Sequence, residues 1–144
     1  MVGTVTDTYV AALQHGIADL PDGAAIVGVV RRATPWFHAQ VEENRPALGP
    51  PEALLAEVKE RHEALVADGI ADAEGHNAAM DDVNYDERYL EHLDTSPDAK
   101  AALADLRDRV ASGEDVALVC YENTDEKRCH RTLLRDRLKQ ELSG

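Results

Sequence analysis

The chain is poor in cysteine, aromatic residues and long apolar runs, and each shortage excludes a class of protein. Two cysteines among 144 residues cannot build the disulfide framework of a small secreted domain. The longest apolar run, Ala24 to Val30, is far shorter than the roughly 20 residues that a membrane span needs. No charged segment followed by an apolar one opens the chain at Met1. We therefore expect a cytoplasmic protein without a membrane anchor.

Basic residues are also scarce, and lysine most of all. The 28 Asp and Glu residues outnumber the 15 Lys and Arg residues, which gives a formal net charge of −13. Such an acidic, lysine-poor composition indicates a protein kept soluble at very high salt, as in a halophilic organism. It argues against a broad surface for non-specific nucleic-acid binding, because such a surface needs a positive potential.

The pattern that is present predicts one α/β domain over residues 1–144. Strands are predicted at Val2–Val5, Ala24–Val30 and Val116–Cys120, and helical patterns lie between them. The second strand is apolar on both faces, as in a central parallel strand that helices cover from both sides. We therefore expect a small three-layer domain in which helices flank a mostly parallel sheet of three to four strands.

Capping and turn residues predict where the helices begin and end. Asp7 is expected to cap a first helix that carries Val10 and Ile17 on one face. Asn84 and Glu87 are expected to form a capping pair. The helices predicted further along the chain run from Pro51 to about Asp68, from Asn84 to Leu93, from Ser96 to Ala111 and from Thr132 to Leu142. The segments 33–50 and 69–84 show no clear period and are interpreted as mostly irregular.

The most informative segment is Val116 to Leu134. Its apolar strand is followed by a polar loop that delivers Cys129, His130 and Arg131 to the start of a helix. The unpaired N–H groups and the positive dipole end at a helix N-terminus stabilise a thiolate or a bound anion. Ligands of parallel sheets sit outside the carboxyl ends of the strands. If the second and third predicted strands are neighbours, Arg31, Arg32 and Glu122 share this crevice.

Two chemical hypotheses follow, and the first is an anion site. Arg128, His130, Arg131 and the N–H groups around Cys129, with Arg31 and Arg32 nearby, would bind the phosphate of a nucleotide or a short nucleic acid. The window 127–139 holds six of the basic residues and one acid. Four of the six form one stripe if the helix extends back far enough, namely Lys127, Arg131, Arg135 and Lys139. The alternative for this stripe is a solvated helix face.

The second hypothesis is a thiol-dependent enzyme. Cys129 would be the nucleophile, His130 the proton carrier and Glu122 the residue that orients them. The structural alternatives are a buried Cys129, a His130 that holds the loop through a backbone carbonyl, and a Glu122 paired with Arg128. Cys120 and Cys129 would form a redox pair only if the loop folds back. A zinc site has no fourth ligand in the sequence, so no metal is predicted. A third hypothesis is a non-catalytic interaction protein.

The same segment resembles the domain of unknown function 488 family. In that family a hydrophobic strand ends in Cys-x-Glu, and a charged loop leads to Cys-His-Arg, a small hydroxyl residue and two apolar residues. Here Cys120-Tyr121-Glu122 precedes a charged loop and Cys129-His130-Arg131-Thr132-Leu133-Leu134. The family's second strand usually ends in Asp-x-Arg, where this chain has Val30-Arg31-Arg32. The resemblance implies a small α/β fold and no established reaction.

Overall fold

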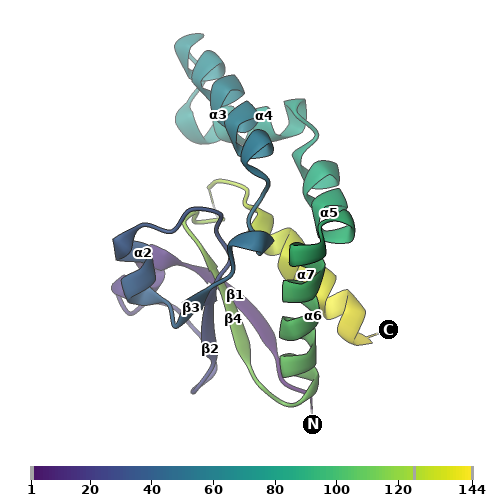
Figure 1. Cartoon of the computed structure of the whole chain (residues 1–144). Helices are drawn as coiled ribbons and strands as arrows, with labels where there is room; N and C mark the ends of the chain where they lie inside the picture. Colours follow the sequence, from purple (N-terminus) through teal and green to yellow (C-terminus); the bar gives the residue numbers. More distant parts are fainter. Residues whose placement is uncertain (1, 125, 144) are drawn as a thin grey trace.

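The computed structural model describes residues 2–124 and 126–143, which form a four-stranded parallel sheet with helices on both faces (Figure 1). The strands are β1 (Val5–Tyr9), β2 (Ala25–Gly28), β3 (Glu43–Asn44) and β4 (Val116–Cys120). Their order in the sheet is β1-β4-β2-β3. β4 pairs with both β1 and β2, so the second and third predicted strands are neighbours. The predicted α/β class and parallel sheet are confirmed.

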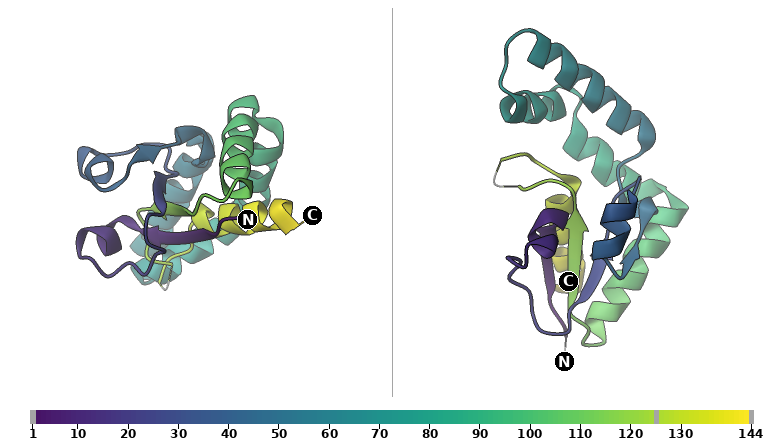
Figure 2. Two further views of the ribbon diagram at one scale, coloured as in Figure 1. Left: turned by 90° about the horizontal axis from the view of Figure 1, so that it is seen from below. Right: turned by 90° about the vertical axis from the view of Figure 1, so that its left-hand side faces the viewer.

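The sheet is the middle of three layers. The helices on one face are α1 (Val10–Gln14) and α2 (Pro35–Gln40), and those on the other are α6 (Pro97–Ala111) and α7 (His130–Ser143) (Figure 2). Side chains of the β2 segment alternate between these layers: Val27 and Val29 are buried with α6 and α7, whereas Val30 is buried with Phe37 of α2. This two-sided burial explains why the segment is apolar throughout.

A helical cap stands over the carboxyl ends of the strands. The chain leaves the sheet through a 3₁₀ turn, η1 (Pro46–Leu48), and forms the hairpin α3 (Glu52–Ala67) and α4 (Asp72–Asp82) before α5 (Tyr85–Thr95) leads back (Figures 1 and 2). α3 ends just before Gly69, whose φ of 93° places it in the left-handed region that favours glycine. The cap therefore covers the edge of the sheet where ligands of parallel sheets bind. No helix among residues 2–124 and 126–143 is long and apolar enough to cross a membrane.

The start of the chain differs from the prediction. β1 spans Val5–Tyr9 instead of Val2–Val5, and Asp7, predicted as a helix cap, lies in this strand opposite Leu118. Its carboxylate accepts hydrogen bonds from Arg131 and Arg135, so tertiary contacts compensate a residue that is rare in strands. α1 ends at Gln14, which leaves Ile17 outside the helix and exposed.

The two segments without a clear period are structured. Segment 33–50 holds α2, β3 and η1, and segment 69–84 holds α4. The hydroxyl of Thr34 caps α2 by accepting a hydrogen bond from the Phe37 amide, and Pro35 is the first helical residue. The predicted capping pair of Asn84 and Glu87 is wrong, because Asn84 adopts φ 56° and its side chain makes no capping bond. The helices α3, α6 and α7 and the strand β4 are confirmed.

Close packing between α2 and the sheet depends on Gly28. A Cβ atom at this position would lie 2.4 Å from Cε1 of Phe37 and 2.6 Å from Oδ1 of Asn44. Phe37 is fully buried, and the Asn44 side chain is fixed by bonds to both the N–H and the C=O of Val30. Neither neighbour can retreat without breaking packing or hydrogen bonds.

We therefore expect Gly28→Ala to lower the free energy of unfolding by about 1–3 kcal/mol, the usual cost of overpacking a core. Urea denaturation measures it. The control is Gly16→Ala, which meets no neighbour within 4 Å and tests only the positive φ of 68°, at roughly 1 kcal/mol. A Gly28→Ala protein as stable as the wild type would show that α2 does not pack tightly on β2.

Candidate functional site

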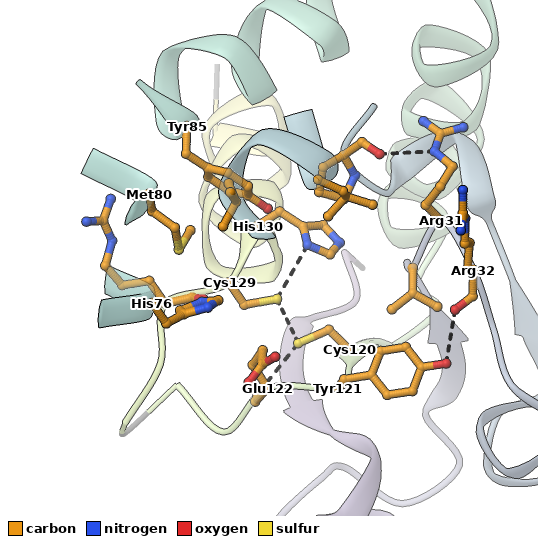
Figure 3. Close-up of a pocket in the computed structure, with 15 residues that line it drawn as sticks. Arg31, Arg32, His76, Met80, Tyr85, Cys120, Tyr121, Glu122, Cys129 and His130 are labelled. Carbon is orange, nitrogen blue, oxygen red and sulfur yellow. Dashed lines mark hydrogen bonds between the residues drawn. The ribbon is translucent and has the colours of Figure 1, made fainter. Parts of the chain in front are cut away.

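A cavity of about 190 Å³ lies between the carboxyl ends of β2 and β4 and the helical cap (Figure 3). The residues after both strands line it, as predicted for neighbouring strands. Leu55, Val58, Met80 and Tyr85 of the cap and α5 add a largely apolar wall. Cys129 and His130 reach the cavity from the start of α7. The structure therefore joins the Cys129-His130 turn with the β2 end.

Two buried sulfur atoms meet at this cavity. Cys120 is the last residue of β4, and Cys129 immediately precedes α7. The loop between them folds back, so that their Sγ atoms lie 2.9 Å apart (Figure 3). Both are free cysteines, with relative exposures of 0% for Cys120 and 7% for Cys129. A pair of Cys120 and Cys129 was predicted only for the case that the loop folds back, and the loop does fold back and brings the two sulfurs together.

The two thiols have pKa values shifted in opposite directions. The pKa of Cys129 is lowered, first by the hydrogen bond from Cys120 and then by the bond from the backbone N–H of Arg131 and by the Arg131 charge, against the opposing effect of burial. The pKa of Cys120 is raised well above its usual value, first by burial and then by its bond to Cys129. Once Cys129 is ionised, only Cys120 has a proton to donate. Of the two, Cys129 is therefore the thiol that ionises more readily.

His130 supplies a neutral ring nitrogen beside the Cys129 sulfur. Its Nε2 lies 2.5 Å from the carbonyl oxygen of Val29, which can only accept a hydrogen bond, so Nε2 carries the proton. Its Nδ1 then has a free lone pair and lies 3.4 Å from Sγ of Cys129. Burial lowers the pKa of His130 and keeps the ring neutral. This arrangement suits transfer of a proton from Cys129 to Nδ1.

Arg131 is not a cavity residue. Its side chain is 3% exposed, and it donates hydrogen bonds to the Asp7 carboxylate, the Thr8 and Glu122 carbonyls, the Thr124 hydroxyl and the Cys120 sulfur. These bonds tie the carboxyl ends of β1 and β4 to the loop before α7. The guanidinium thus holds the site together, and the backbone N–H of the same residue supports the thiolate.

The other three predicted arginines are placed differently from one another. Arg31 lines the cavity but donates to the carbonyls of Gly49 and Pro50. Arg32 stands at the mouth, with a side chain that is 77% exposed and paired with Glu52. Arg128 is half-buried and paired with Asp81 and Asp86 of the cap region. Of these three arginines, Arg32 and Arg128 are therefore the two whose ion-pair partners are exposed to water.

Glu122 lines the cavity without orienting His130. Its backbone carbonyl accepts a hydrogen bond from Arg131 and lies 3.6 Å from the Cys120 sulfur. Its negative charge raises the pKa of Cys129. Among the described contacts, the Val29 carbonyl is the group that fixes the histidine ring. The His130 ring is thus oriented by a backbone carbonyl and not by the Glu122 side chain, and a backbone contact of this kind cannot be predicted from the sequence.

Several residues that the sequence analysis missed also shape the site. The hydroxyl of Tyr121 accepts a hydrogen bond from the Thr34 N–H and donates one to the Arg32 carbonyl, which joins the β4 end to the α2 side. Tyr121 stands inside the Cys-x-Glu motif, so its position was a usable signal. His76 of α4 bonds the Arg128 carbonyl and lines the cavity. No local pattern pointed to His76.

The basic stripe is not a continuous free surface. α7 begins at His130, so Lys127 precedes the helix, and its ammonium pairs with Asp72 of the cap. Arg131 is buried, and Arg135 pairs with Asp7 and Asp136. Within residues 2–124 and 126–143, no group of three His, Cys, Asp or Glu side chains could hold a metal ion.

The chain belongs to the domain of unknown function 488 family. The family model that matches is described as the active DUF488-N3 subclade, and it matches residues 9–142. The resemblance seen in the C-terminal motif thus extends over nearly the whole chain. Searches of curated proteins and of solved structures gave no match.

The unequal burial of two arginines that share Asp7 gives a test of the site's framework. We expect Arg131→Gln to lower the free energy of unfolding by about 3–5 kcal/mol, because it leaves a buried carboxylate without its inner partner. Arg135→Gln removes the outer partner, whose side chain is 30% exposed, and should cost about 1 kcal/mol or less. Urea denaturation of both variants measures the difference. Equal losses would contradict a framework centred on Arg131.

Proposed function

We propose that this protein is a thiol-dependent enzyme with Cys129 as its nucleophile. The observation that carries the proposal is the convergence of three groups on one sulfur at the cavity: the Cys120 thiol, the Arg131 backbone N–H and the His130 ring nitrogen. The first two stabilise the thiolate form of Cys129. The third can take the proton that the Cys129 thiol gives up when it ionises. A packing cysteine needs none of the three, and a lowered pKa is a property of reactive cysteines.

The reaction class follows from these roles. The Cys129 sulfur supplies an electron pair to an electrophilic carbon of the substrate, which forms an S–C bond as the bond to the leaving group breaks. The proton that His130 Nδ1 accepts from the thiol passes to the leaving group. Water or a second substrate then releases the product from the sulfur and restores the thiol.

The cavity restricts the substrate to a small molecule or to the reactive end of a larger one. Its volume of about 190 Å³ is below the roughly 300–1,000 Å³ of sites for drug-sized ligands. The wall formed by Leu55, Val58 and Met80 favours an apolar group. Arg32 and Arg128, at the polar part of the lining, favour an anionic group on the same molecule.

Cys129 should react with iodoacetamide as a thiolate of lowered pKa. We expect the rate of its alkylation to reach half its maximum at a pH below ~8.5, the value of a free thiol, because the Cys120 bond and the Arg131 N–H stabilise the anion. Mass spectrometry of tryptic peptides separates the two cysteines, because Lys127 and Arg128 lie between them.

Two variants control this measurement. Cys120→Ala removes the strongest stabilising bond and should move the Cys129 profile to higher pH. Cys129→Ser leaves only Cys120, which should stay unreactive until strongly alkaline pH. A wild-type Cys129 that titrates at or above the free-thiol value would refute the nucleophile.

Phosphate binding is the second candidate, and the exposed Arg32 at the cavity mouth favours it. Here the ligand would be a nucleotide or a short nucleic-acid strand, without any role for the thiol. Arg31 and Arg131 are already engaged by backbone carbonyls and Asp7, so Arg32 and Arg128 would supply the charge. Phosphate binding would thus depend on two arginine side chains, whereas the thiol proposal rests on three groups that converge on one sulfur.

If phosphate binding is correct, a mononucleotide should bind the wild type with an affinity that falls as salt rises. Arg32→Ala should then weaken binding roughly tenfold, the worth of a charged hydrogen bond. Arg61→Ala is the matched control, because Arg61 pairs with Asp82 on the cap and does not line the cavity. Calorimetric titration measures all three. Equal affinities for the two variants would refute this site, and absence of both binding and alkylation would leave a docking role for the chain.

A further inference from the structure

The distance between the two sulfurs suggests more than support of a thiolate. The Sγ atoms of Cys120 and Cys129 lie 2.9 Å apart, so less than about 1 Å of movement separates them from the bond length of a disulfide. They are also the only two cysteines of the sequence. A thiol that merely filled space at the end of β4 could be replaced by any small apolar residue. Cys120 instead places its sulfur next to the Cys129 sulfur, which lines the cavity.

We propose that peroxides oxidise this site to a reversible Cys120–Cys129 disulfide, with Cys129 attacked first and Cys120 as the resolving thiol. The proposal shares its thiolate with the proposed function but does not require a carbon substrate. It assigns a second role to the cavity, which is large enough to admit hydrogen peroxide.

The steps balance with peroxide as the only oxidant. The Cys129 thiolate attacks one peroxide oxygen, so that an S–O bond forms and the O–O bond breaks. The departing hydroxide takes up the proton that the Cys129 thiol lost on ionisation and leaves as water. The Cys120 sulfur then gives up its proton and attacks the Cys129 sulfur, which forms the S–S bond and breaks the S–O bond. The second hydroxide takes that proton and leaves as water. The two sulfurs lose two electrons together, and one peroxide gains them.

The surroundings of each sulfur fit these two roles. Cys129 lines the cavity, where peroxide arrives, beside the neutral ring of His130. Cys120 is completely buried, and its sulfur accepts a bond from Nη1 of Arg131 at 3.3 Å. Burial and the bond to Cys129 raise the pKa of Cys120, and the Arg131 charge acts against them, so it favours the ionised form that Cys120 must adopt when it attacks. Attack by Cys120 is also favoured by proximity, because the two sulfurs lie 2.9 Å apart.

The fold holds the intervening loop in the conformation that the disulfide requires. Arg131 bonds the Glu122 carbonyl and the Thr124 hydroxyl, and α4 bonds the far side of the loop through Asn77, which contacts the N–H of Arg128. The entropy of closing the loop is therefore lost on folding and not on oxidation. Oxidation converts the nucleophile into an unreactive disulfide, and a dithiol restores it.

The test treats the reduced protein with a small excess of hydrogen peroxide and follows free thiols and intact mass. The wild type should lose both thiols together and the mass of two hydrogen atoms, remain monomeric on a non-reducing gel and recover both thiols in dithiothreitol. Cys120→Ala should stop at a sulfenic acid on Cys129, seen as one added oxygen and trapped by dimedone. Cys120→Ser serves as a second variant if the first fails to fold.

Three results would overturn the inference. They are a Cys129 that gains two or three oxygens in the wild type without a disulfide, a disulfide between two molecules, and thiols that persist under peroxide. These outcomes are distinct from failure of the proposed function. A Cys129 that alkylates with a lowered pKa but forms no disulfide keeps the nucleophile and removes the redox role. A disulfide that forms in a protein whose Cys129 does not alkylate with a lowered pKa keeps the redox role and removes the proposed nucleophile.

Discussion

A buried ion pair between Arg131 and Asp7 is the interaction on which the rest of the site depends. Both side chains are at least seven-eighths buried, and an uncompensated charge there would cost several kcal/mol. The pair is accommodated because the guanidinium also satisfies the carbonyls of Thr8 and Glu122. One side chain thereby joins β1, β4 and the following loop. The start of α7, and with it Cys129, is fixed by this junction.

The same pair explains why the thiolate depends on hydrogen bonds more than on charge. Asp7 neutralises the nearby guanidinium, and Glu122 contributes a negative charge that opposes ionisation of Cys129. What stabilises the anion is first the Cys120 thiol and then the Arg131 backbone N–H. A helix start provides such an N–H by its geometry. The sulfur therefore needs no cation in direct contact, and the neutral His130 ring keeps a lone pair on Nδ1 that can accept a proton.

Features encoded by neighbouring residues could be predicted from the sequence. Ser96 and Pro97 begin α6, an apolar run gives β4, and the Cys129-His130-Arg131 turn does open the last helix. Features that depend on distant partners could not. Asp7 is a poor strand residue, and it is compensated by the guanidinium of Arg131, which α7 brings to β1. The hydrogen-bond partners of each arginine also depend on residues that are distant in the sequence. The sequence shows that a positive charge is present but not which carbonyl or carboxylate it binds.

The helical cap links the cavity to the loop that precedes Cys129. α4 contacts that loop through polar bonds, from His76 to the Arg128 carbonyl and from Asn77 to the Arg128 N–H and the Glu126 carbonyl. The same helix places Met80 in the cavity wall. A displacement of α4 would therefore change the cavity and the position of Cys129 together. The shape of the cavity and the position of the Cys129 sulfur are thus coupled through one short set of hydrogen bonds.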